Sequence, residues 1–262
     1  MKLRKIARPT ATTISTGFLI PGALALVFSV TANSQVLAFI GLGLTFWGAL
    51  FLFIRPTRYV QSAILDSTAS STYTNIDRII KDMKPKGKTY HVPPYPKDVY
   101  LPEHLKGLKD MIMFISQDPT DEAPSIEEMA KSKFLLQNPK GICMTPPGAG
   151  LLAQFEKELR RDITKLQINE LCESLTQLIT ENLQMAKEAE FTIEEKQVEL
   201  KLIDSTYRNL YNKENMRSVN QIGCPLVSAI ACAIAKTTGK TVNIQKIITT
   251  PDGQTVVATY QM

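Results

Sequence analysis

The N-terminal part of the chain contains two long apolar runs without an acidic or basic side chain. They extend from Ile14 to Val30 and from Val36 to Ile54, and the five residues Thr31–Gln35 between them are small or polar. A helix needs about 20 mainly apolar residues to cross a hydrocarbon layer of roughly 30 Å, and each run comes close to that length. The pattern predicts a transmembrane helical hairpin over residues 1–58, with spans near 14–30 and 36–54.

Basic residues flank this predicted hairpin on one side only. Four precede the first run and two follow the second, whereas the connecting turn has no charge; they are Lys2, Arg4, Lys5, Arg8, Arg55 and Arg58. Lys and Arg are concentrated on the cytoplasmic side of membrane proteins. We therefore expect a two-span protein of the cell membrane with both termini in the cytoplasm and the lipid bilayer as a partner.

The chain after the hairpin divides into three predicted parts. Residues 59–84 carry a helical apolar pattern that ends at Lys84–Gly87, because Pro cannot continue a helix. Residues 85–140 form a proline-rich connector with a small strand and loop region, in which His91–Pro96 is polyproline-like and Val99–Leu101 and Met111–Ile115 are short strands. Residues 141–262 form the main domain.

Helical and strand patterns alternate regularly in this main domain. Short helices are expected at 151–161, 168–189, 205–216 and 225–236, and strands at 141–144, 191–193, 198–202, 241–249 and 254–261. The two hairpins are separated by helices rather than by the single helix of a parallel crossover. We therefore predict an α+β fold with an antiparallel sheet and helices on one face.

The charge distribution argues against nucleic acid as a partner. The chain has 30 basic and 25 acidic residues, but all six basic residues before Tyr59 are unopposed, and 24 basic and 25 acidic residues remain after them. The cytoplasmic part is therefore close to neutral, whereas a nucleic-acid-binding domain concentrates basic residues on one face.

The turn Thr145–Gly150 is the candidate anion site. Its glycines Gly148 and Gly150 directly precede a predicted helix, whose free N–H groups and dipole favour an anion. Thr145 is a further candidate ligand in the same turn. The turn lacks the Lys-Ser/Thr pair of a P-loop, and the alternative is a purely structural turn set by Pro146 and Pro147.

Cys224 is the one candidate catalytic residue. It lies at the start of a predicted helix, an environment that lowers a thiol pKa and favours reaction. The alternative is a buried structural cysteine, because the segment to Ala235 is almost entirely small and apolar. Neither histidine has zinc-ligand spacing and no CxxC pair occurs, so we expect no metal, no cofactor and no disulfide.

One segment carries a family resemblance. The run SVNQIGCPLVSAIACAIAKTTGK, residues 218–240, resembles a family of archaeal membrane-anchored proteins with no assigned activity. The helix-then-hairpin ending is also similar to four-vinyl-reductase and TRAPP-type ligand-binding domains, which implies an apolar pocket and dimers. That likeness covers about the last third of the chain, and residues 241–262 lack the cysteines usual in the final hairpin of four-vinyl reductases.

Three functions are compatible with these features. The first is a non-enzymatic, membrane-anchored interaction or regulatory module that binds itself or a protein partner at the cytoplasmic surface. The second is a small-molecule or lipid sensor with an apolar pocket near the Cys224 helix. The third is a thiol-dependent enzyme acting on lipid-linked or thioester substrates through Cys224.

Overall fold

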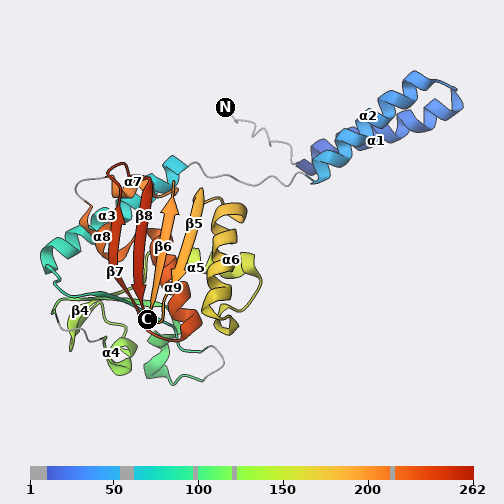
Figure 1. The fold of residues 1–262 in the computed structure, drawn as a ribbon. Helices are drawn as coiled ribbons and strands as arrows, with labels where there is room; N and C mark the ends of the chain where they lie inside the picture. The colour runs from blue at the N-terminus through green and yellow to red at the C-terminus, as the bar shows by residue number, and fades with distance from the viewer. Residues whose placement is uncertain (1–10, 54–61, 97–99, 120–122, 213–215) are drawn as a thin grey trace, which may run out of the picture. The chain divides into compact units, whose positions relative to one another are not determined.

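The computed structural model describes residues 11–53, 62–96, 100–119, 123–212 and 216–262 (Figure 1). The chain divides into two compact units, residues 1–60 and 61–262. The charged flanks of the predicted hairpin, residues 1–10 and 54–61, lie outside the described residues.

The first unit is a pair of antiparallel helices, α1 (Ala11–Thr31) and α2 (Gln35–Phe53). Three glycines bring the helix backbones together, because a Cβ added at any of them would lie within 3.0 Å of the other helix; they are Gly22, Gly41 and Gly48. The Ser15 hydroxyl donates a 2.7 Å hydrogen bond to the carbonyl of Gly48. Small residues thus make a close helix–helix contact.

Another part of the chain is long and apolar enough to cross a membrane, by length and composition only. Among the described residues this stretch is Arg217–Thr238, and 83% of its apolar 18-residue window is buried inside the second unit. By the same measure the apolar helices of the hairpin are shorter, Ser15–Thr31 and Gln35–Phe51. The position of the hairpin in a membrane stays a prediction.

The second unit is built on one antiparallel sheet of eight strands, in the order β3-β4-β2-β1-β7-β8-β6-β5. The strands are β1 (Thr89–Val92), β2 (Ile112–Ser116), β3 (Leu135–Gln137), β4 (Lys140–Met144), β5 (Glu188–Ile193), β6 (Gln197–Ile203), β7 (Val242–Thr249) and β8 (Thr255–Gln261). The α+β class predicted from the sequence is confirmed.

Helices pack on one face of this sheet around the main core. They are α3 (Ser62–Met83), α5 (Ala149–Leu159), α6 (Ile168–Gln177), α7 (Arg208–Tyr211), α8 (Arg217–Ile222) and α9 (Pro225–Thr238), with the short 3-10 helix η2 (Ile163–Lys165). Strand β6 shows why, because Val198, Leu200 and Leu202 alternate with more exposed residues. Alternation gives this part of the sheet one buried and one open face.

At the other end of the sheet both faces are covered. The 3-10 helix η1 (Glu103–Lys109) and α4 (Ile126–Ala130) form a second small core with β1 and β2. In β2, Ile112 contacts this second core, whereas Met113 and Ile115 belong to the main core. The prediction of helices on one face only needs correction here, since neighbouring residues of a strand point to opposite faces.

The segment 85–140 is part of the sheet. His91, predicted in a polyproline-like connector, lies in β1 opposite Met113 of β2 and Val242 of β7. Val99 lies outside the described residues, and Tyr100 and Leu101 are irregular. Strand β1 lies inside the sheet because β2, the next strand of the chain, pairs with one of its edges and β7, from the end of the chain, pairs with the other.

Two predicted helices are shorter than their patterns. The helix expected over 168–189 is α6 followed by one π-helical turn, η3 (Leu178–Asn182), and Glu188 already begins β5. The helix expected over 205–216 is reduced to α7, and residues 213–215 lie outside the described residues.

Helix α3 is an integral part of the second unit. Its side chains Tyr73, Ile76 and Ile80 are buried in the main core. The Tyr73 hydroxyl donates a 2.6 Å hydrogen bond to the carbonyl of Gly223, and Asp77 accepts one of 2.7 Å from the Ser218 N–H at the start of α8. The predicted juxtamembrane helix therefore packs into the domain core.

Candidate functional site around the buried helix α9

Helix α9 passes through the centre of the second unit. It begins with Cys224 as extended N-cap and Pro225 in the first turn, where the missing proline N–H costs no hydrogen bond. It ends at Gly239, whose positive φ of 67° suits glycine. Ten consecutive residues, 226–235, are buried between, so the helix has no solvent-facing side over this length.

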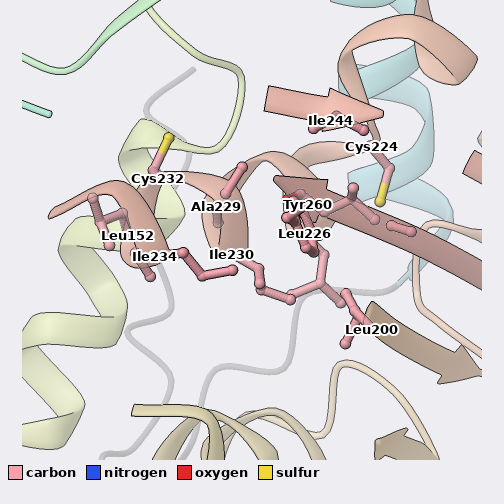
Figure 2. Packing of buried hydrophobic residues seen from close by; sticks show 14 of the residues in the cluster. Leu152, Leu200, Cys224, Leu226, Ala229, Ile230, Cys232, Ile234, Ile244 and Tyr260 are labelled. Carbon is pink, nitrogen blue, oxygen red and sulfur yellow. The ribbon is translucent and has the colours of Figure 1, made fainter. Parts of the chain in front are cut away.

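Figure 2 shows how this helix fills the core. Leu226 and Ile230 lie toward Leu200 and Tyr260 of the sheet, and Cys224 and Cys232 lie at opposite ends of the labelled stretch. The Tyr260 hydroxyl donates a 3.0 Å hydrogen bond to the carbonyl of Val227. Small side chains let α9 approach its neighbours on every side.

Cys224 is fully buried beneath tyrosine side chains. Its backbone N–H donates a 3.1 Å hydrogen bond to the Tyr211 hydroxyl. Burial raises the pKa of the Cys224 thiol, although hydrogen bonds from Tyr211 and the helix N-terminus act in the opposite direction. A thiol that is neutral and inaccessible is a poor nucleophile, so the geometry favours the structural alternative for this residue.

The candidate anion turn is divided between a buried and an exposed part. Gly148 is buried against α9, and a Cβ there would lie 2.0 Å from the Ala229 nitrogen. Its N–H donates a 3.3 Å hydrogen bond to the Ser228 hydroxyl. Thr145 and Gly150 are exposed, and nothing lies within 4 Å of a Cβ built at Gly150. Gly148 thus has a packing role.

A buried pair absent from the sequence-based candidates lies beside this turn. His91 Nε2 and Ser228 Oγ share a 3.2 Å hydrogen bond, and both residues are fully buried. Burial lowers the pKa of His91 to about 3, so the imidazole is neutral at physiological pH. Within the described part of the chain, its Nδ1 has no hydrogen-bond partner.

The chemistry of this pair is limited by access. A serine beside a neutral imidazole is the start of a nucleophile and general-base arrangement, but a substrate has to reach the hydroxyl. Here Ser228 Oγ accepts the Gly148 N–H, and the surrounding side chains cover both residues. The pair joins β1, α5 and α9 through one hydrogen-bonded network.

One signal in the sequence points to Ser228. It is the one hydroxyl in the apolar run Leu226–Ala235, where a polar group needs an internal partner. Nothing in the sequence identifies His91 as that partner, because the two residues are 137 positions apart.

An ion pair lies at the C-terminal end of α9. Lys236 forms a hydrogen-bonded ion pair with Glu156 of α5, and both side chains are largely screened from solvent. The Thr237 hydroxyl donates a 2.9 Å hydrogen bond to the carbonyl of Ile163. In the part of the chain that the structure describes, no group of three His, Cys, Asp or Glu residues is arranged to hold a metal ion.

Comparisons with known proteins place the chain in one family. No curated protein and no solved structure matches it. The likeness to four-vinyl-reductase and TRAPP-type domains therefore stays a prediction, as does an archaeal origin. Residues 2–261 match the family described as Domain of unknown function (DUF7982), so the chain belongs to that family.

Proposed function

We propose that this protein is a non-enzymatic, self-associating interaction or regulatory module, anchored in the cell membrane by the hairpin α1–α2. Both termini lie in the cytoplasm, and the second unit works close to the cytoplasmic membrane surface.

The observation that carries the proposal is the apolar outer surface of the hairpin. Thirteen of the nineteen exposed large hydrophobic residues in the described part of the chain belong to α1 and α2. They are Phe18, Ile20, Leu24, Val27, Phe28, Val30, Val36, Phe39, Ile40, Leu42, Phe46, Trp47 and Leu50. A helix pair in water has a polar outer stripe, whereas a lipid-facing pair is apolar all round.

The contact inside the hairpin supports the same environment. Lipid gives no hydrophobic driving force for helix association, so membrane helices pack through small residues and buried hydrogen bonds. Gly22, Gly41 and Gly48 provide the close approach, and Ser15 provides the hydrogen bond.

The non-enzymatic part of the proposal follows from access. The three candidate nucleophilic or acid–base groups described above, Cys224, Ser228 and His91, are each fully buried. A reactive thiol needs an electropositive and partly exposed setting. We expect Cys224 to react with a neutral alkylating reagent at pH 7.5 no faster than Cys172. Faster, selective alkylation of Cys224 would instead support the thiol enzyme.

Membrane fractionation tests the anchor. We expect the full-length protein to remain with membranes through an alkaline carbonate wash and to be released by detergent. Single cysteines introduced at Ser34 and at Lys240 test the topology with an impermeant thiol reagent applied to intact cells. We expect labelling at Ser34 alone. Release by carbonate, or labelling at Lys240, would contradict the proposal.

A further inference from the structure

The four strands β5, β6, β8 and β7 leave one face of the sheet uncovered. Figure 1 shows these strands toward the viewer, with α9 behind them. Along β8, Val256, Ala258 and Tyr260 are buried in the core, whereas the alternate residues remain partly exposed. Many antiparallel sheets have one face open to solvent. Whether this face binds a partner therefore depends on the side chains that it carries.

Strand register defines the rows of side chains on this outer face. One row runs through Glu190, Lys201, Val257 and Ile248 of β5, β6, β8 and β7. The next row runs through Thr192, Glu199, Thr259 and Lys246. Thr255 and Ile203 share a third row with Glu188. On β8 this face is β-branched and uncharged, with Thr255, Val257 and Thr259, whereas the neighbouring β6 carries the charged residues Glu199 and Lys201.

Charge on this face is divided between its two sides. Acidic residues lie on β5 and β6, at Glu188, Glu190 and Glu199, and Lys201 donates a 2.9 Å hydrogen bond to Glu190. The opposite side, β7, carries Lys246. Within the described residues, Glu188, Glu199 and Lys246 belong to no ion pair. The face thus has an acidic side and a basic side.

We infer that this outer sheet face associates with the same face of a second copy of the chain, with β5 of one copy over β7 of the other. A two-fold axis parallel to the strands, between β6 and β8, produces this arrangement. Lys246 of one copy then lies over Thr192 of its partner, between Glu190 and Glu199. Stacked sheets lie about 10 Å apart, a distance that these side chains span. The inference rests on the self-association in the proposed function and specifies its surface.

The size of the face sets the strength of the contact. Four strands about 4.8 Å apart and about six residues long at 3.4 Å each project onto roughly 400 Å² per copy. That is about half of the roughly 800 Å² per partner that a standard interface buries, so we expect a weak, transient complex. Tethering both copies to one membrane raises their effective concentration and compensates for low affinity.

The β5 edge is protected against the competing mode of association, addition of strand to strand. Its outward residues Glu188 and Glu190 are acidic, and two such edges side by side would bring like charges together. Charged residues on an edge strand are a common protection against edge pairing. Face-to-face packing avoids this repulsion because it pairs β5 with β7.

A charge exchange tests the inference on the full-length protein in liposomes. Copies labelled at the N-terminus with donor or acceptor dyes report association by energy transfer as the lipid-to-protein ratio is varied. We expect Lys246→Glu and Glu199→Lys each to weaken association by roughly fivefold, which is about 1 kcal/mol, since the two-fold axis makes two such contacts and an exposed ion pair contributes about 0.5 kcal/mol. The double variant K246E/E199K should restore wild-type association to within about twofold.

A matched control keeps the result specific. Lys157→Glu makes the same charge change at an exposed position on α5, and we expect it to leave association unchanged. If the wild type associates and both charge variants associate equally well, the contact between copies does not involve this sheet face. In that case this inference fails and the proposed self-association stands. If the wild type is monomeric at every density, the proposed self-association fails with it.

Discussion

The hairpin α1–α2 and the helix α9 are both apolar and rich in small residues, but different surroundings cover them. In α9 the protein itself buries ten consecutive residues. In the hairpin only the contact between the two helices is covered, and large side chains such as Phe39 and Val30 remain 75% and 80% exposed. By length and hydropathy alone, the segment that contains α9 could cross a membrane. Apolar length alone therefore does not distinguish a core helix from a membrane helix; the covering surface does.

The largest effect should come from placing a charge in each region. Ala231→Asp in α9 would bury an unpaired carboxylate at a site with no exposed surface, and we expect a loss of at least about 4 kcal/mol, which is enough to unfold the domain. Leu42→Asp in the hairpin should leave the domain folded and weaken membrane insertion by about 3 kcal/mol. Near-ultraviolet circular dichroism and carbonate extraction report the two effects. If L42D unfolded the domain, the hairpin and α9 would not differ in what covers them, and the comparison would be wrong.

Two glycine substitutions in α5 and its N-cap test how tightly the protein packs around α9. Gly148→Ala places a Cβ 2.0 Å from the Ala229 backbone nitrogen, so α5 and α9 must separate, and we expect a loss of about 3 kcal/mol. Gly150→Ala is the matched control, because it lies in α5 with open space around it. That variant should gain about 0.5–1 kcal/mol. Urea unfolding of the two variants in detergent measures both, and equal stabilities would contradict the packing described.

The buried imidazole predicts a pH dependence for the α9 network. Burial lowers the pKa of His91 from 6.5 to about 3, so the unfolded chain binds this proton more readily than the folded chain. The stabilisation is complete above pH 6.5 and is lost as pH falls toward 3, by about 1.4 kcal/mol per pH unit. His91→Asn should flatten the plot of unfolding free energy against pH between 6.5 and 4, whereas Ser228→Ala should keep its slope. Parallel plots for wild type and H91N would disprove this assignment.

A smaller effect is expected where α3 joins the domain. Tyr73→Phe removes the hydroxyl bonded to the Gly223 carbonyl and leaves that carbonyl unpaired, for a loss of about 1–2 kcal/mol. Tyr100→Phe is the control, because its ring is 88% exposed and the loss should stay within about 0.5 kcal/mol. Thermal unfolding distinguishes them. Equal melting temperatures for the two variants would mean that α3 is not held through this hydrogen bond.

Local patterns predicted most elements of the second half well. The terminal hairpin was expected at 241–249 and 254–261 and occurs as Val242–Thr249 and Thr255–Gln261. Pro225 and Gly239 predict the helix after Cys224, and in the structure Pro225 lies in its first turn and Gly239 is its C-cap. These signals are short-range, so the residues that cause them lie within the element itself.

Long-range contacts explain what the sequence did not predict. His91 precedes a run of prolines that indicates a connector, but β2, the next strand, and the distant β7 pair with its segment and make it an internal strand. The contact of Gly148 with Ala229 likewise joins positions far apart in the chain. The sequence therefore gives no sign that Gly148 packs against α9, and the anion site at this turn stays a prediction. Cys224 was predicted as either buried or reactive, and only the three-dimensional arrangement of Tyr211 and its neighbours favours one of these.

The hydrogen bonds of α3 have a practical consequence for obtaining the second unit in isolation. The proline-rich stretch after Met83 resembles a natural place to truncate the chain, and a fragment starting there would lack Tyr73, Ile76 and Asp77. It would expose part of the main core and remove the carboxylate that accepts the Ser218 N–H in the first turn of α8. A longer fragment that starts near Gln61 retains these contacts and is the piece that we expect to fold on its own.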